Sequence, residues 1–196
     1  FKDCTTIQRV YLYDTIKNLG DKSFYGCNSL ISIRLSVNIE EIPLYAFYKC
    51  SNMEKIAIPD GVKRLGLWAF SSCIKLKDIE LPESLEEIHS SFSDCTSMTQ
   101  IELPNNLKVL DGGFYGCTTL ESIVLPDSIS TIGQSTFMYC SNLKYIKLPM
   151  NLKQISANAF RGCNLLNDID FPDGLTRIHN EAFAECANIS NVELPD

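Results

Sequence analysis

The sequence predicts a β-rich solenoid of the α/β type, with eight complete coils, part of a ninth, and a parallel β-sheet along one face. Three observations predict this fold. Phenylalanine recurs every 22 or 23 residues, each such Phe is followed three positions later by Cys, and apolar positions continue in step after each Cys. A fixed period of this length is typical of repeat architectures, in which each unit buries its apolar face against its neighbours. We therefore expect a single solenoid domain over residues 1–196.

Each coil starts at a phenylalanine, and the nine Phe-x-x-Cys units account for every cysteine of the chain. The phenylalanines are Phe1, Phe24, Phe47, Phe70, Phe92, Phe114, Phe137, Phe160 and Phe183. The cysteines are Cys4, Cys27, Cys50, Cys73, Cys95, Cys117, Cys140, Cys163 and Cys186. Only small residues (Ala, Ser, Gly or Thr) directly precede the eight later phenylalanines, which indicates a tightly packed position.

After Cys, the pattern reads L-x-x-I-x-L-P-x-x-L-x-x-I. The I-x-L stretch, as in residues 123–125, alternates branched side chains and is followed by Pro126, which cannot donate a ladder hydrogen bond. One short strand per coil is therefore expected there. The L-x-x-I step that follows suits an arc or a short helical turn, because no copy has room for ten periodic residues.

A single coil cannot fold alone. Ordering about 23 residues costs roughly 1–2 kcal/mol each in backbone entropy, whereas about six buried apolar side chains return only about 1.5–3 kcal/mol each. Stacking of neighbouring coils must supply the remaining stabilising free energy.

The unit seen as LKYIKLPMNLKQISANAFRGC from residue 143 resembles the BspA-like leucine-rich repeat of bacterial and protist surface proteins. Departures are Tyr13 and Ser36 in the Pro position, Met53 and Met98 in a Leu position, and one-residue deletions before two phenylalanines. The resemblance covers essentially the whole chain. It implies a parallel-sheet leucine-rich repeat solenoid without catalytic residues, secreted or displayed at the cell surface and used for attachment to host or neighbouring-cell molecules.

Composition excludes some classes of partner. The net charge of −7 and a pI near 4.9 argue against nucleic acid, whose binders collect a basic face. No apolar run approaches the length of a membrane span, so we expect no membrane insertion in this segment. Neither end carries a capping coil. We therefore expect either part of a longer protein or end-to-end self-association.

The spacing of the cysteines indicates whether they bind a metal, form disulfides or pack in the core. Zinc sites usually pair their ligands as C-x2-4-C, whereas one thiol per coil forms a line. Adjacent coils bring the Cα atoms within disulfide range, but parallel Cβ vectors disfavour the bridge. Free Cys behaves as a small buried hydrophobe. We expect a reduced packing ladder, with cross-coil disulfides and metal or redox chemistry as alternatives. An unpaired ladder suits the cytosol or an organism living without oxygen.

The sequence offers little for catalysis. His89 and His179 sit four coils apart in links, and the pairs Glu40-Glu41 and Glu86-Glu87 occupy solvent positions. No phosphate-binding or nucleophile-elbow motif occurs. We expect no enzyme activity, no cofactor and no metal.

Two surfaces are candidates for binding a protein partner. The first is the outward face of the I-x-L strands, where basic and acidic bands alternate. The banding could match a complementary partner, but ordinary mixing of surface charge is the favoured explanation. Its candidate residues are Arg9, Tyr11, Arg34, Lys55, Asp78, Glu80, Glu102, Tyr145, Lys147, Asp168 and Asp170.

The second surface is an aromatic patch of Tyr25, Tyr45, Tyr48 and Trp68 beside the Phe column. Aromatic side chains are enriched at binding hot spots, but they also shield the apolar interior at solenoid edges. The function expected is a non-catalytic recognition or adhesion module at a cell surface. The alternative is an intracellular scaffold or a spacer, in which case the protein is cytoplasmic.

Overall fold

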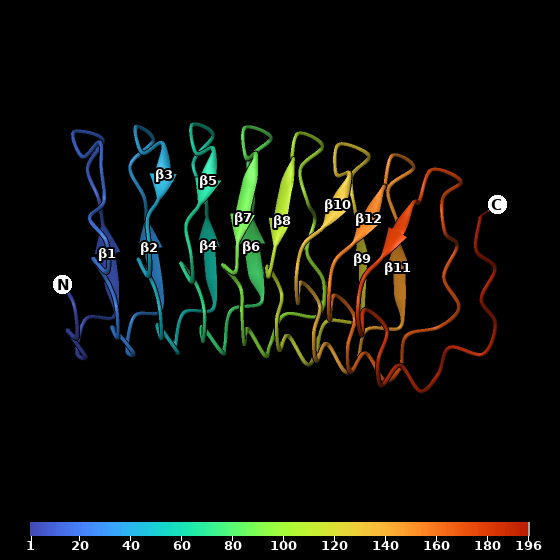
Figure 1. Cartoon of the computed structure of the whole chain (residues 1–196). Helices are drawn as coiled ribbons and strands as arrows, with labels where there is room; N and C mark the ends of the chain where they lie inside the picture. Colours follow the sequence, from blue (N-terminus) through green and yellow to red (C-terminus); the bar gives the residue numbers. More distant parts are fainter. Residues whose placement is uncertain (196) are drawn as a thin grey trace.

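The computed structural model describes residues 1–195; Asp196, the last residue of the expected domain, lies outside the described residues. The chain forms a single row of stacked coils that runs from the N-terminus to the C-terminus (Figure 1). Every strand pairing is parallel, and residues 1–195 contain no helix. The predicted parallel β-solenoid is confirmed.

One row of strands lies where the I-x-L pattern predicts it. These strands pair in register as β1 with β2, β4 with β6, and β9 with β11, so that Val10 lies opposite Ile33 and Ile123 opposite Ile146. Residues 100–102 and 168–170 have the same pattern but are not assigned as strands. The strands of this row are β1 (Arg9–Tyr11), β2 (Ser32–Arg34), β4 (Lys55–Ala57), β6 (Asp78–Glu80), β9 (Ser122–Val124) and β11 (Tyr145–Lys147).

The longest sheet lies at the L-x-x-I step, where the expectation of an arc or a short helical turn was wrong. Its seven parallel strands run in the order β13-β12-β10-β8-β7-β5-β3. This pairing spans seven coils, fewer than the eight complete coils predicted. The strands are β3 (Glu41–Ile42), β5 (Arg64–Leu65), β7 (Glu87–His89), β8 (Val109–Asp111), β10 (Thr131–Ile132), β12 (Gln154–Ile155) and β13 (Arg177–Ile178).

The F-x-x-C, C-x-x-L and P-x-x-L spacings of the pattern are single hydrogen-bonded turns. The N–H of Leu85 donates to the carbonyl of Pro82 at 3.0 Å, that of Cys117 to Phe114 at 3.1 Å, and that of Leu120 to Cys117 at 3.1 Å. Each turn closes an i to i+3 bond and is not continued into a helix. A period of three residues is therefore compatible with a chain that turns and then extends for two or three residues.

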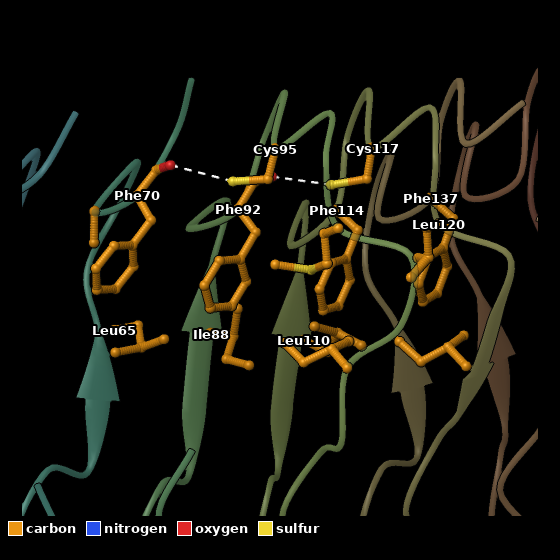
Figure 2. Close-up of a cluster of buried hydrophobic side chains, with 14 of the residues drawn as sticks. Leu65, Phe70, Ile88, Phe92, Cys95, Leu110, Phe114, Cys117, Leu120 and Phe137 are labelled. Carbon is orange, nitrogen blue, oxygen red and sulfur yellow. Dashed lines mark hydrogen bonds between the residues drawn. The ribbon is translucent and has the colours of Figure 1, made fainter. Parts of the chain in front are cut away.

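The core is a continuous column of stacked rings. Successive phenylalanines from Phe1 to Phe183 have ring centroids 5.0–5.7 Å apart and planes within 15° of parallel. Figure 2 shows Phe70, Phe92, Phe114 and Phe137 beside the apolar side chains of the seven-stranded sheet. The ring of each coil lies directly over the next, so the backbone before each Phe must approach its neighbour closely. This accounts for the small residues there; Ala46 and Ala69, for example, are fully buried.

Candidate functional site

The edge of the solenoid around the phenylalanines has an unusual backbone. We call the five residues centred on each Phe the turn edge, and name its columns by their offset from Phe. In every coil for which the columns exist, the residues at −2 and +2 have positive φ, in the left-handed region. Non-glycine residues occupy most of these positions, including Tyr45 at 55° and Trp68 at 53°. That region costs an ordinary residue roughly 1–2 kcal/mol, so the stacked coils must impose it.

Hydrogen bonds between coils explain how it is imposed. The N–H groups of Tyr45, Phe47 and Lys49 donate to carbonyls of the next coil at 3.0, 2.7 and 2.9 Å. The intervening N–H groups of Ala46 and Tyr48 close turns within their own coil. The turn edge is therefore a rigid zigzag whose −2, +1 and +2 side chains can form a surface.

The aromatic patch predicted from the sequence is assembled on this edge. Tyr45 and Trp68 stack with ring centroids 5.0 Å apart and planes 19° apart. Tyr25 and Tyr48 stack at 5.0 Å, and Tyr45 meets Tyr48 edge-on at 5.2 Å. Lys22 lies 5.5 Å from the centroid of the Tyr45 ring. All four predicted residues thus belong to one cluster.

Three of the four residues of the patch form one wall of a groove with a volume of about 520 Å³. Tyr45, Tyr48 and Trp68 line it at one end and Tyr115 farther along the edge. Between them the −2 column carries only Ser90 and Gly112, because the large side chains of the earlier coils are replaced by small ones. The groove thus arises from differences between coils in one column.

Carboxylates make the groove acidic. Asp94 and Asp111 both line it, together with Ser71, Ser93 and Gln134, whereas no lysine or arginine does. Within residues 1–195 neither carboxylate has a hydrogen bond or an ion pair. Partial burial raises the pKa of Asp94 above its usual value. This is a polar, negatively charged site with an aromatic wall.

The sequence reasoning missed Ser90, Asp94, Asp111, Gly112 and Tyr115. A signal was present, because the −2 column changes abruptly from Tyr45 and Trp68 to Ser90 and Gly112. The sequence analysis placed +1 residues beside this column, but only the structure shows that the +2 column, with Asp94, shares the same surface.

The strand-face residues are mostly exposed, but two of them are engaged within the chain. Arg34 forms a bidentate pair with Asp14 at 2.8 and 3.1 Å and lies 4.7 Å from the Tyr11 ring centroid. Asp168 accepts hydrogen bonds from the N–H groups of Ser190 and Asn191, and these bonds lower its pKa to about 2. The exposed members are Arg9, Tyr11, Lys55, Asp78, Glu80, Glu102, Tyr145, Lys147, Asp168 and Asp170.

The cysteines form a ladder in which none is bridged. Cys27 to Cys163 are buried, and each Sγ from Cys27 to Cys186 lies 3.0–3.3 Å from the carbonyl oxygen of the Phe in the preceding coil. Figure 2 shows two of these bonds, from Cys95 and Cys117. Burial raises the pKa of the Cys73 and Cys117 thiols to about 12, so these thiols are not poised as nucleophiles.

The histidines and glutamates considered in the sequence analysis do not gather at one site. His89 is half-buried, with Nε2 3.1 Å from Glu87, and His179 lies four coils away. Glu41 pairs with Arg64 at 2.6 Å and Glu86 with Lys108 at 2.8 Å, in each case between neighbouring coils. Within residues 1–195 there is no group of three or more His, Cys, Asp and Glu side chains that could hold a metal ion. No helix in this range has the length and hydropathy of a membrane span.

A row of coils with parallel strands, hydrogen-bonded turns and one Phe, Cys and Leu rung per coil defines a leucine-rich repeat solenoid. The chain belongs to the family described as the BspA type Leucine rich repeat region (6 copies), whose profile matches residues 1–112 and 108–196. The predicted family is confirmed. No curated protein sequence matches the chain.

Solved structures with this fold come from several bacteria. The leucine-rich repeat protein of T. pallidum (TpLRR) is 30% identical, with a TM-score of 0.78 over 82% of this chain and 78% of that one. A leucine-rich repeat protein from Bacteroides ovatus is 25% identical, with a TM-score of 0.57 over 100% of this chain and 68% of that one. One from Eubacterium ventriosum is 22% identical, with a TM-score of 0.63 over 96% and 60%, and shows the shared fold.

Proposed function

We propose that this chain is a non-catalytic protein-recognition module that is displayed at a cell surface and adheres to host or neighbouring-cell proteins. Leucine-rich repeat solenoids generally bind proteins through extended faces. The surface location is proposed from the family resemblance, and the intracellular scaffold or spacer is the alternative.

The observation that carries the proposal is the groove on the turn edge. Its volume of about 520 Å³ and its wall of Tyr45, Tyr48 and Trp68 combine concavity with the residue types enriched at hot spots. Trp68 keeps 37% of its surface exposed although it sits in a strained backbone position. A side chain that only shields the core would not need that exposure.

Binding to matrix proteins tests this function. The protein would be immobilised and probed with a panel of host extracellular matrix proteins by surface plasmon resonance. We expect Trp68→Asn to weaken capture of the bound protein at least tenfold, because asparagine tolerates positive φ but lacks the ring. Tyr139→Asn is the matched control, since Tyr139 also has positive φ, at 61°, and lies outside the groove.

The strand face is the alternative binding surface, and a second variant tests it. Charge reversal at Asp78, Glu80 and Glu102 should leave capture unchanged. If this variant loses binding while Trp68→Asn retains it, the partner binds the strand face. If neither variant changes the capture of any partner, the recognition proposal for both surfaces is wrong.

We also propose that the apolar hollow of about 300 Å³ on the last described coil is covered in one of two ways, by a further coil of a longer protein or by end-to-end association with a second copy. Its lining includes Phe171, Phe183, Ile189, Val192 and Leu194. A further coil or a second copy would cover these side chains. Light scattering that shows a folded monomer at high concentration would contradict the self-association.

A further inference from the structure

Along the turn edge, the chain's own cations accompany acidic and aromatic side chains on both sides of the groove. In the eighth coil, Arg161 at column +1 pairs with Glu181 and with Glu185, the latter at 2.7 Å. Those carboxylates occupy columns −2 and +2 of the ninth coil. At the other end, Lys22 lies 5.5 Å from the Tyr45 ring centroid and Lys2 lies 5.4 Å from that of Tyr25.

No lysine or arginine lines the groove between these ends, although Lys22 and Lys49 lie over the Tyr45 and Tyr48 rings of its wall, at 5.5 and 5.3 Å from the ring centroids. Asp94 occupies column +2, as Glu185 does, but column +1 of its neighbours carries Ser71 and Tyr115 in place of an arginine. One face of the Trp68 indole is covered by Tyr45. The next coil presents only Ser90 at that column, so the opposite face borders the groove.

We infer that the groove binds an arginine side chain of an extended partner segment, with the guanidinium stacked on Trp68 and paired with Asp94 or Asp111. This inference rests on the proposed function and names the chemistry of its partner. Two unpaired carboxylates and four aromatic side chains line the groove, and no lysine or arginine does. Such a surface is complementary to a planar cation.

The chain itself contains this arrangement elsewhere. The Arg34 guanidinium lies 4.7 Å from the Tyr11 ring centroid while it forms two hydrogen bonds with Asp14, at 2.8 and 3.1 Å. Arginine suits such a site better than lysine, because its flat fork stacks on a ring and bonds a carboxylate at the same time. A neutral saccharide could stack on Trp68 as well, but its binding would not depend on negative charge.

Fluorescence titration tests the inference directly, because Trp68 is the only tryptophan of the chain. The probe is an acetylated, amidated peptide of alternating glycine and arginine, and the comparison peptide carries citrulline, a neutral analogue, at each arginine. We expect saturable quenching by the arginine peptide and at least tenfold weaker binding of the citrulline peptide. Asp94→Asn and Asp111→Asn should each weaken arginine-peptide binding about five- to tenfold, and high salt should weaken it too.

A matched control is available in the first coil. Asp3 also occupies column +2 with positive φ. Its side chain has the same surroundings as that of Asp94: each Oδ1 lies 2.3 Å from the position that a Cβ would take on the +2 glycine of the next coil, Gly26 for Asp3 and Gly116 for Asp94. Asp3→Asn should leave binding unchanged. Ser90→Tyr should continue the ring column, cover Trp68 and block the peptide, with circular dichroism confirming the fold.

Three results would overturn the inference: equal binding of the citrulline peptide, unchanged binding in both aspartate variants, or quenching by a neutral chito-oligosaccharide that neither aspartate variant affects. The last result would identify a saccharide groove. Capture of a matrix protein that still depends on Trp68, with no arginine-peptide binding, would defeat the arginine inference and leave the proposed function intact.

Discussion

The thiol-to-carbonyl bond of the cysteine ladder makes a quantitative prediction at Cys117. This residue is fully buried, and its Sγ lies 3.0 Å from the carbonyl oxygen of Phe92. Cys117→Ala removes a bond worth about 1 kcal/mol and apolar burial comparable to one methylene, about 0.8 kcal/mol. The Phe92 carbonyl also accepts from the N–H of Cys95 at 3.1 Å, so it is not left without a partner. We expect the free energy of unfolding to fall by about 2 kcal/mol.

Cys117→Ser separates the hydrogen bond from the packing of sulfur. The hydroxyl keeps a donor toward Phe92 while the apolar contact is lost, so we expect an intermediate loss of about 1 kcal/mol. The assay is urea denaturation followed by circular dichroism at pH 7 with a reducing agent. Cys4→Ala is the control, because Cys4 is only half-buried and its Sγ makes no hydrogen bond to a phenylalanine carbonyl within residues 1–195. A serine variant less stable than the alanine variant would refute the role of the thiol as a donor.

Three further predictions concern the thiols, the strained backbone and pH. In the native protein at pH 8, a thiol reagent should modify Cys4 and Cys186 before the buried cysteines, as mass mapping of the labelled peptides would show. Ser72→Gly should raise the free energy of unfolding by up to about 1 kcal/mol by relieving a φ of 60°, whereas Gly116→Ala should lower it by about 1–2 kcal/mol; urea titration compares the two. Because the folded pKa of Asp168 is lowered to about 2, its carboxylate stabilises the fold above pH 4 and this stabilisation is lost as pH falls toward 2. Asp168→Asn should therefore be less stable than the wild type at pH 6, and the difference should shrink by pH 3.

The repeat made most of the core predictable from the sequence. The Phe, Cys and Leu columns are buried as their spacing predicts, and Phe47, Cys50 and Met53 are all fully buried. Side chains that recur in every coil must occupy equivalent places in the stack. The Met substitutions fit the column because methionine fills irregular space in a core.

The second sheet could not be predicted from the same pattern. A step of L-x-x-I has the spacing of a helix, and two or three residues are too few to show the alternation of a strand. Pairing with the next coil makes Arg64–Leu65 and Glu87–His89 strands, and that pairing depends on the stacking of whole coils. Local sequence carries little information about such a contact.

The residues with positive φ could not be predicted from the sequence for a related reason. Positive φ usually signals glycine or asparagine, but the −2 and +2 columns include tyrosine, tryptophan, lysine and glutamate. The inter-coil hydrogen bonds fix this backbone geometry whatever the side chain, so the columns are free to vary in sequence. The buried columns therefore specify the shape of the coil. The −2 column can change from Trp68 to Ser90 to Gly112 along the chain without changing the path of the backbone. A recognition surface would be expected where the fold tolerates such variation, and the groove on the turn edge lies there.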